Sequence, residues 1–167
     1  MTSISFYEFT SKTESEGKWQ PIPIPIPPAS TTSPQTPLTP IPIPSITLLT
    51  WNIWFDALFQ NPRFTTILHT ITTYPNLDIV ALQEVTPQFM HLAKSHPEIQ
   101  RNWIITDYTD SEHGTEIQRT WYGNIFLVRR GLVEAGEIRG WVKRFEGSKM
   151  RRFVVLLEIS RGSKSLV

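Results

Sequence analysis

Residues 46–53 read ITLLTWNI, and residues 77–85 read LDIVALQEV. Each stretch begins as a short apolar run with β-branched residues, and each carries a polar side chain near its end, Asn52 in the first and Glu84 in the second. Runs of this length and composition are typical of buried β-strands. We therefore predict a buried strand, ITLLTW, that ends at Asn52, and a second, LDIVAL, that ends shortly before Glu84.

One helix is predicted between these strands and another after the second strand. The first has apolar residues at the i, i+3, i+4 and i+7 spacing of one helix face, namely Phe64, Ile67, Leu68 and Ile71. Asn61 is predicted to cap this helix, with Pro62 at the first helical position. Thr86 followed by Pro87 is predicted to open the second helix. Its apolar residues are Phe89, Met90 and Leu92.

The remainder of the chain is predicted to consist mostly of strands. Apolar and β-branched runs indicate strands over residues 103–107, 122–128 and 153–159, with a polar loop at residues 108–120. Arg161-Gly162-Ser163 indicates a hairpin turn that enters a further strand.

Composition changes abruptly where a Pro-rich stretch ends. Ten of the 14 prolines fall between Pro21 and Pro44, where they remove backbone donors and favour extended polyproline II. We therefore predict three segments: an aromatic N-terminal segment at residues 1–20, a Pro-rich disordered linker at 21–45, and a partial domain at 46–167.

The linker has two interpretations. It is either a spacer or a docking ligand for an SH3- or WW-type partner, because Pro25 to Pro28, Pro34 to Pro37 and Pro37 to Pro40 have PxxP spacing. The N-terminal segment is expected to dock partly on the domain, since its aromatic residues are too dense for an ordinary tail. These residues are Phe6, Tyr7, Phe9 and Trp19.

Charge and cysteine content limit the classes of function. The formal net charge is +1 and the pI is about 8.1, so composition alone does not indicate a polyanionic partner, and nucleic-acid binding must be local. The absence of cysteine excludes disulfide frameworks and Cys-based zinc sites, which leaves oxygen or imidazole as metal ligands. No signal-peptide pattern or membrane-length apolar run occurs, so we expect a soluble, intracellular protein with no membrane partner.

Asn52 and Glu84 carry the chemistry that the two strand ends indicate. Mg²⁺ binds through one or two carboxylates together with water and substrate phosphate, and Glu84 is a carboxylate at the end of a rigid strand. The Asn52 amide both donates and accepts hydrogen bonds, which suits orientation either of a scissile phosphate or of a group that itself holds the metal or the phosphate. The alternatives are a solvated glutamate at a strand end and an Asx turn made by Asn52.

Three ordered segments resemble the endonuclease/exonuclease/phosphatase superfamily. They are TWNI at residues 50–53, ALQEV at 81–85, and YGNIFLVRR at 122–130 followed by SKMRR at 148–152. Within the superfamily the segments are most similar to those of the 5′-tyrosyl-DNA phosphodiesterases. The resemblance covers about residues 46–160.

The resemblance implies both a fold and a site. The fold is α+β, a DNase I-like sandwich of two sheets with flanking helices, of which this chain supplies the N-terminal half. The site uses Mg²⁺, or Mn²⁺, with Asn52 and Glu84 catalytic and Glu84 the metal ligand. Tyr122 and Arg152 bind substrate, and Tyr122 does so by stacking on a DNA base. The alternative role of Tyr122 is structural, as a strand-edge aromatic residue that fills the sandwich. The implied activity is hydrolysis of 5′-tyrosyl-linked DNA ends in DNA repair, in the nucleus, the cytoplasm or both.

Later motifs of the family are absent from the sequence. The GD-x-N motif that activates water does not occur, and no histidine follows the Ser-Asp pair of the terminal motif. We therefore expect a truncated member that is inactive alone, with its histidines on the surface. They are His69, His91, His96 and His113. The alternative functions are a non-catalytic Pro-rich binding protein, or a relative acting on inositol phosphate, sphingomyelin, abasic DNA or RNA.

A few residues near these motifs have further expectations attached. Arg129 and Arg130 are predicted to be solvated at a strand end. Lys149, Arg151 and Arg152 either contact phosphate or belong to a solvated basic turn. Trp54 stands where animal relatives often have an acidic residue, which leaves the substrate preference at that edge open.

Overall fold

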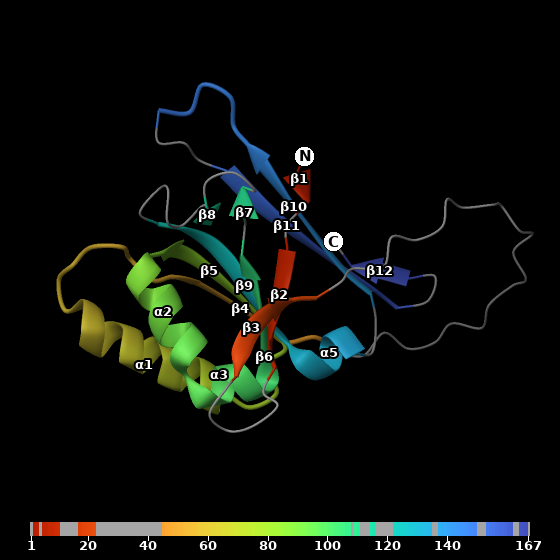
Figure 1. Ribbon diagram of the computed structural model, residues 1–167, viewed down its shortest axis with the longest axis horizontal. Coiled ribbons are helices and arrows are strands. Elements are labelled where there is room, and N and C mark those ends of the chain that lie inside the picture. The colour runs from red at the N-terminus through yellow and green to blue at the C-terminus, as the bar shows by residue number, and fades with distance from the viewer. Residues whose placement is uncertain are drawn as a thin grey trace, which may run out of the picture.

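The computed structural model describes residues 2–3, 5–10, 17–22, 45–107, 109–110, 114–115, 122–134, 137–149, 153–161 and 164–166. Two larger sheets and a group of helices make up this part of the protein (Figure 1). The helices are α1 (Gln60–Thr73), α2 (Pro87–Ser95), α3 (Pro97–Asn102) and α5 (Arg130–Glu134). The strands are β1 (Thr2–Ser3), β2 (Ser5–Thr10), β3 (Lys18–Pro21), β4 (Leu48–Asn52), β5 (Ile79–Val85), β6 (Trp103–Asp107), β7 (Thr109–Asp110), β8 (Gly114–Thr115), β9 (Gly123–Arg129), β10 (Glu137–Arg144), β11 (Phe153–Arg161) and β12 (Lys164–Leu166).

The strands form a mixed sheet and an antiparallel sheet. The larger sheet has the order β3-β2-β6-β9-β5-β4, and the smaller has the order β1-β10-β11-β12. β4 and β5 pair in parallel, as a strand–helix–strand unit requires. The other described pairs are antiparallel, including β7 with β8 in a separate ribbon. This is the α+β, two-sheet fold that the sequence predicts.

One hydrophobic core lies between the two larger sheets. Phe6, Ile79 and Val128 enter it from the six-stranded sheet, and Ile138 and Ile159 enter it from the four-stranded sheet. Each of these side chains is buried, and burying one stabilises the fold by about 1.5–3 kcal/mol. The sheets therefore pack face to face, as predicted.

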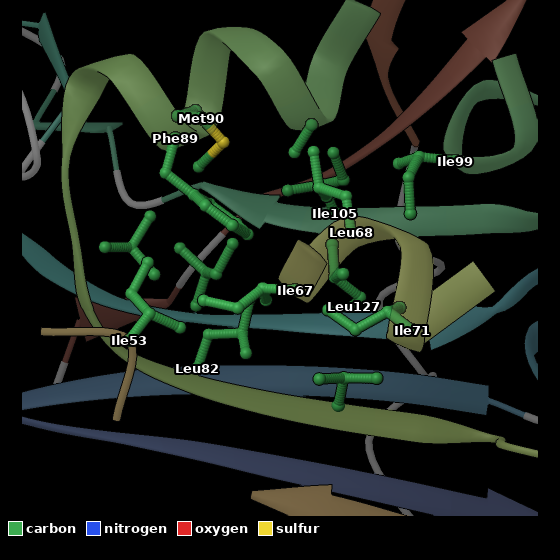
Figure 2. Close-up of a cluster of buried hydrophobic side chains, with 14 of the residues drawn as sticks. Ile53, Ile67, Leu68, Ile71, Leu82, Phe89, Met90, Ile99, Ile105 and Leu127 are labelled. Atoms are coloured by element: carbon green, nitrogen blue, oxygen red, sulfur yellow. The ribbon is translucent and has the colours of Figure 1, made fainter. Parts of the chain in front are cut away.

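A second core lies between the six-stranded sheet and the helices (Figure 2). Figure 2 shows side chains of α1 and α2 gathered around Leu82 of β5 and Leu127 of β9. The buried face of α1 has the four residues that the helical spacing predicts, namely Phe64, Ile67, Leu68 and Ile71. The helices thus cover one face of the larger sheet while the smaller sheet packs on the other.

The predicted start of α2 is confirmed, but that of α1 is wrong. The Thr86 side chain caps α2 by accepting a hydrogen bond from a first-turn backbone N–H at 3.2 Å, and Pro87 is the first helical residue. α1 begins at Gln60, before the predicted position, and its N-cap is Phe59 rather than Asn61. Phe59 has a left-handed backbone (φ 51°) and makes no side-chain capping bond, so the preceding loop, and not a cap, sets this boundary.

β4 is half-exposed, which contradicts the prediction of a buried strand. Leu49 and Trp51 pack on the helix-side core, whereas Leu48 and Thr50 are exposed. The reason is that β4 is an edge strand of the six-stranded sheet, a position that the apolar run alone does not reveal. β5 also lies further along the chain than predicted and includes Glu84.

The N-terminal segment docks on the domain, as expected. β2 pairs with β6 at the edge of the larger sheet, β3 pairs with β2, and β1 pairs with β10 in the smaller sheet. Phe6 is fully buried between the sheets. Trp19 Nε1 donates a hydrogen bond to the Lys94 backbone oxygen of α2 at 2.9 Å. This short segment therefore adds strands to both sheets.

The prediction that Arg129 and Arg130 are solvated is wrong. The Arg129 guanidinium lies 4.4 Å from the centroid of the buried Trp103 ring, and its Nε donates to the Leu77 carbonyl at 3.2 Å. Arg130 is half-buried and forms an ion pair with Glu8 of β2. Both residues anchor neighbouring segments because β9 is a central strand and its end is covered.

The remaining strand predictions are largely confirmed. β6, β9 and β11 correspond to the predicted strands, and β12 is the predicted further strand, paired antiparallel with β11. Gly162 and Ser163 of the predicted turn lie outside the described residues. β10 and α5 were not predicted, and β7 and β8 fall within the predicted polar loop. Residues 23–44, most of the predicted linker, lie outside the described residues. None of the described helices is long and apolar enough to cross a membrane.

Candidate active site

Asn52 and Glu84, the two polar residues predicted from the strand ends, are in contact. β4 and β5 are parallel neighbours, with Asn52 opposite Gln83 in the register, so the carboxyl ends of both strands meet. Asn52 Nδ2 donates a hydrogen bond to Glu84 Oε1 at 2.9 Å. The fold thus brings an amide and a carboxylate together at the end of two strands.

Glu84 owes its orientation to an irregularity in β5. The pairing of β5 with β9 shifts register between Leu82 and Val85. Val80 and Leu82 belong to the helix-side core, and strict alternation would also place Glu84 there. Instead Val85 occupies that core. A bulge of this kind re-aims a side chain, and here it turns Glu84 out of the core toward Asn52.

Backbone strain is concentrated at this end of the sheet. Trp54 (φ 60°), Phe59 (φ 51°) and Glu84 (φ 60°) are three of the four described non-glycine residues with positive φ. The left-handed conformation costs about 1–2 kcal/mol for such a residue. Strain of this kind persists where function requires a fixed geometry, which marks this region as the candidate site.

The loop that follows β4 closes directly on the Asn52–Glu84 pair. The Trp54 backbone N–H donates to Asn52 Oδ1 at 2.9 Å, so the Asx turn considered for Asn52 is present. The Phe55 backbone N–H donates to Glu84 Oε2 at 3.2 Å. Each carboxylate oxygen therefore accepts one hydrogen bond and retains a further lone pair.

Tyr122 lies beside the site through an aromatic stack. It immediately precedes β9, whose first residue, Gly123, lies opposite Val85. The Tyr122 and Phe55 rings are stacked, with centroids 4.8 Å apart and planes inclined by 10°. Since Phe55 also donates to Glu84, this stack links Tyr122 to the carboxylate.

Arg63 of α1 fixes the loop and was missed by sequence reasoning. Its guanidinium donates to the backbone oxygens of Leu58, Trp54 (2.8 Å) and Asp56 (2.7 Å). It also lies 4.9 Å from the Trp54 ring centroid. An arginine in the first turn of a predicted helix gives no sequence signal of this role. The role of Phe55 was missed too, although an exposed aromatic residue close after Asn52 was a usable signal.

The donor atoms of the site fit a hard divalent cation that keeps most of its water. Glu84 is a single carboxylate, and Asn52 adds an amide. Among the described residues, no three His, Cys, Asp or Glu side chains gather as a metal-binding group. Mg²⁺ is commonly bound by one or two carboxylates, with water and substrate phosphate completing its coordination. The site therefore fits Mg²⁺ or Mn²⁺ better than a structural zinc ion.

The other predicted site residues and the histidines are exposed, half-buried or outside the described residues. Arg152 and His113 lie outside the described residues, and Lys149 is exposed in the segment after β10. His69 and His91 are exposed, as predicted. His96 is half-buried and caps α3, with its Nδ1 accepting a hydrogen bond from the Glu98 backbone at 3.3 Å.

The geometry defines a two-sheet α+β domain with a carboxylate–amide pair at the carboxyl ends of two parallel strands. No family model and no curated protein matches the sequence. Solved structures do match the fold. A crystal structure of D. rerio TDP2 complexed with single strand DNA product has a TM-score of 0.55 at 16% identity, over 72% of this chain and 43% of that chain. C. elegans TDP2 has a TM-score of 0.54 at 23% identity, over 72% of this chain and 33% of that chain.

These matches establish the fold. This chain shares the DNase I-like, two-sheet α+β architecture of the TDP2 structures over the matched part. The chain spans less than half the length of the TDP2 chains that it matches. The fold is therefore the one expected from the sequence.

Proposed function

We propose that this domain belongs to a magnesium-dependent phosphodiesterase that acts on DNA, with 5′-tyrosyl-linked ends as its first candidate substrate. The observation that carries the proposal is the Asn52–Glu84 pair, held by a 2.9 Å hydrogen bond at the ends of two parallel strands. The shared fold with TDP2 supports it at the level of the superfamily. Resemblance of the flanking segments supports the finer assignment.

In this proposal Glu84 and Asn52 have different roles. Glu84 holds Mg²⁺ through the lone pairs that its two hydrogen bonds leave available. Asn52 has a second amide N–H that can donate to a phosphoryl oxygen, while the first stays on Glu84. When bound, the cation neutralises charge that develops on phosphoryl oxygens. The bulge and the loop keep both side chains fixed, which lowers the cost of organising them on binding.

DNA is the proposed partner, with Tyr122 and Arg152 as substrate-binding residues. The D. rerio TDP2 structure contains a single strand DNA product, which suggests single-stranded DNA as the ligand to test. Nuclear or cytoplasmic localisation, and an SH3- or WW-type partner for the Pro-rich segment, are also proposals. They rest on substrate chemistry and on PxxP spacing, respectively.

Metal binding is the first test. We expect the chain to bind Mn²⁺, a paramagnetic substitute for Mg²⁺, in a titration followed by electron paramagnetic resonance. Glu84→Gln removes the negative charge but keeps the size of the side chain, so binding should weaken at least tenfold. Glu134→Gln, on α5, is the matched control and should bind like the unaltered chain. Equal binding by the two variants would exclude Glu84 as the ligand.

Hydrolysis is the second test. The family's water-activating and terminal motifs do not occur in these 167 residues, so we propose a chimera that appends those motifs from a 5′-tyrosyl-DNA phosphodiesterase. It should release p-nitrophenol from a 5′-nitrophenyl phosphate nucleotide only with Mg²⁺ or Mn²⁺. Asn52→Ala and Glu84→Gln should abolish this release. A folded, metal-binding chimera with no activity would contradict the assignment.

A further inference from the structure

Large apolar side chains are exposed in one loop beside the candidate site. The loop joins β4 to α1 and stands at the left edge of the view in Figure 1. Its exposed fractions are 48% for Trp54, 46% for Phe55, 53% for Leu58 and 73% for Phe59. We call these four residues the aromatic loop. The neighbouring Ile53 is almost fully buried, so the exposure starts abruptly at Trp54.

The aromatic loop is held in a defined conformation. Arg63 donates to the backbone oxygens of Trp54 and Leu58, two residues of this loop, and to that of Asp56 between them. Asp56 Oδ1 accepts from the Leu58 backbone N–H at 2.8 Å. Gln60 Nε2 donates to the Phe55 oxygen at 3.2 Å. The rings are therefore displayed on a fixed frame, which reduces the ordering cost of binding a ligand.

The aromatic loop is continuous with the candidate site. The Trp54 and Phe55 backbone N–H groups donate to Asn52 and Glu84, and the Phe55 ring stacks on Tyr122. A ligand whose phosphate binds at Glu84 would therefore carry its attached groups within reach of these rings. Three of the four side chains in the loop are flat aromatic rings, and such rings stack on other flat rings.

We propose that the aromatic loop binds a planar aromatic group attached to the phosphate, either a nucleobase or the phenol ring of a leaving group. This inference rests on the proposed function, because the phosphate site positions the ring. The charges of the loop favour this ligand over an anionic membrane surface. Residues 54–59 contain Asp56 and no Lys or Arg, and the Arg63 guanidinium is occupied by loop carbonyls.

The nucleobase source is tested by comparing two single-stranded probes with Mg²⁺ present. One is a 3′-labelled, 5′-phosphorylated thymidine oligomer, and the other is an abasic oligomer of equal length, with affinities measured by fluorescence anisotropy. The thymidine oligomer should bind about 5- to 150-fold more tightly for each stacked base. Phe59→Ala and Phe59→Leu should both reduce this preference, since leucine is apolar but has no ring. Tyr74→Ala, which removes an aromatic residue that is 54% exposed at the far end of α1, should not reduce this preference.

The phenol source is tested by competition against the abasic oligomer. Phenyl phosphate should compete better than inorganic phosphate, and Phe59→Ala should remove that advantage. A Phe59-dependent preference in either test supports the inference and identifies the ring. Absence of a Phe59 effect from both tests would overturn it, as would retention of the full preference in Phe59→Leu. Phe59-dependent binding to phosphatidylserine vesicles, with no preference for thymidine, would indicate a membrane surface instead.

The proposed function and this inference can fail separately. If both oligomers bind equally and Glu84→Gln weakens both, the phosphate site stands and the ring-binding inference falls. If the thymidine preference depends on Phe59 but Glu84→Gln has no effect, the rings bind bases without the proposed site. Absence of binding by any probe at millimolar concentration would overturn both. Circular dichroism spectra that match those of the unaltered chain establish that the variants are folded.

Discussion

The two edges of the six-stranded sheet are built differently. At the β3–β2 edge, Phe6 is fully buried, Trp19 is hydrogen-bonded to α2, and the Glu8–Arg130 ion pair joins β2 to the start of α5. At the β4 edge, Leu48 is 59% exposed, and the chain continues into the aromatic loop. The β3–β2 edge is stabilised by packing and hydrogen bonds, whereas the β4 edge presents side chains to solvent.

The comparison suggests that stability and function are divided between the edges. The N-terminal edge gains burial and satisfied polar groups, which are the terms that stabilise a small domain. The β4 edge has strained residues and exposed rings, which cost stability and are retained where a ligand requires them. Variants at the two edges should therefore differ in the sign and the size of their effects on the free energy of unfolding.

The largest difference should come from truncating an apolar residue at each edge. Phe6→Ala should lower the free energy of unfolding by about 3–5 kcal/mol, because it leaves a cavity between the sheets. Leu48→Ala, its counterpart on β4, should change it by less than about 0.5 kcal/mol. Urea denaturation measures both values. Similar losses at both sites would mean that the edges are equally important to folding.

Removal of the N-terminal ion pair should have a smaller effect. Arg130→Met should lower the free energy of unfolding by about 1–2 kcal/mol, since it leaves Glu8 partly buried without its partner. A double-mutant cycle with Glu8→Gln isolates the pair. Proteolysis of the N-terminal segment should also become faster. A coupling energy near zero would show that the pair does not hold this edge.

Replacing Glu84 by glycine should raise the free energy of unfolding, whereas Phe6→Ala and Arg130→Met lower it. Glu84→Gly places glycine at a φ of 60°, so the free energy of unfolding should rise by about 1 kcal/mol as strain is relieved. Mn²⁺ binding should be lost at the same time. Glu134→Gly, at the last residue of α5, should instead change the free energy of unfolding by less than about 0.5 kcal/mol. A destabilised Glu84→Gly would mean that the hydrogen bonds of the carboxylate outweigh the backbone strain.

The smallest effect should be found in the stack between Phe55 and Tyr122. A double-mutant cycle of Phe55→Leu and Tyr122→Leu should give a coupling of about 0.5 kcal/mol, the lower end for aromatic pairs, because Phe55 is 46% exposed. Thermal unfolding at fixed pH measures it. A coupling above about 1.5 kcal/mol would make the stack a structural contact rather than an adaptable part of the site.

The local sequence pattern predicted the helices and strands of the core. The features that it did not predict depend on contacts with residues far away in the sequence. The α1 face from Phe64 to Ile71 and the Thr86 cap follow from spacing and from capping chemistry within a few residues. The edge position of β4 depends on which strand pairs with β5, and the burial of Arg130 depends on Glu8, far away in the sequence. Neither fact is encoded near the residue that it affects.

The sequence indicated which two residues meet at the candidate site, but not the geometry that holds them. Asn52 and Glu84 were indicated because each ends an apolar run, and the structure places them in contact. The bulge that turns Glu84 outward has no signature such as glycine at that position, since Glu84 itself adopts the left-handed backbone. The loop conformation depends on Arg63, whose hydrogen bonds reach back along the chain to Trp54.

The strand order sets a minimum reach for the segment between β3 and β4. These strands are consecutive in sequence yet lie at opposite edges of the six-stranded sheet, five strand spacings or roughly 24 Å apart. About eight extended residues would cover that distance, far fewer than residues 22–47 provide. The surplus length would let the proposed SH3- or WW-type partner bind the Pro-rich stretch without displacing β2 and β3 from the sheet.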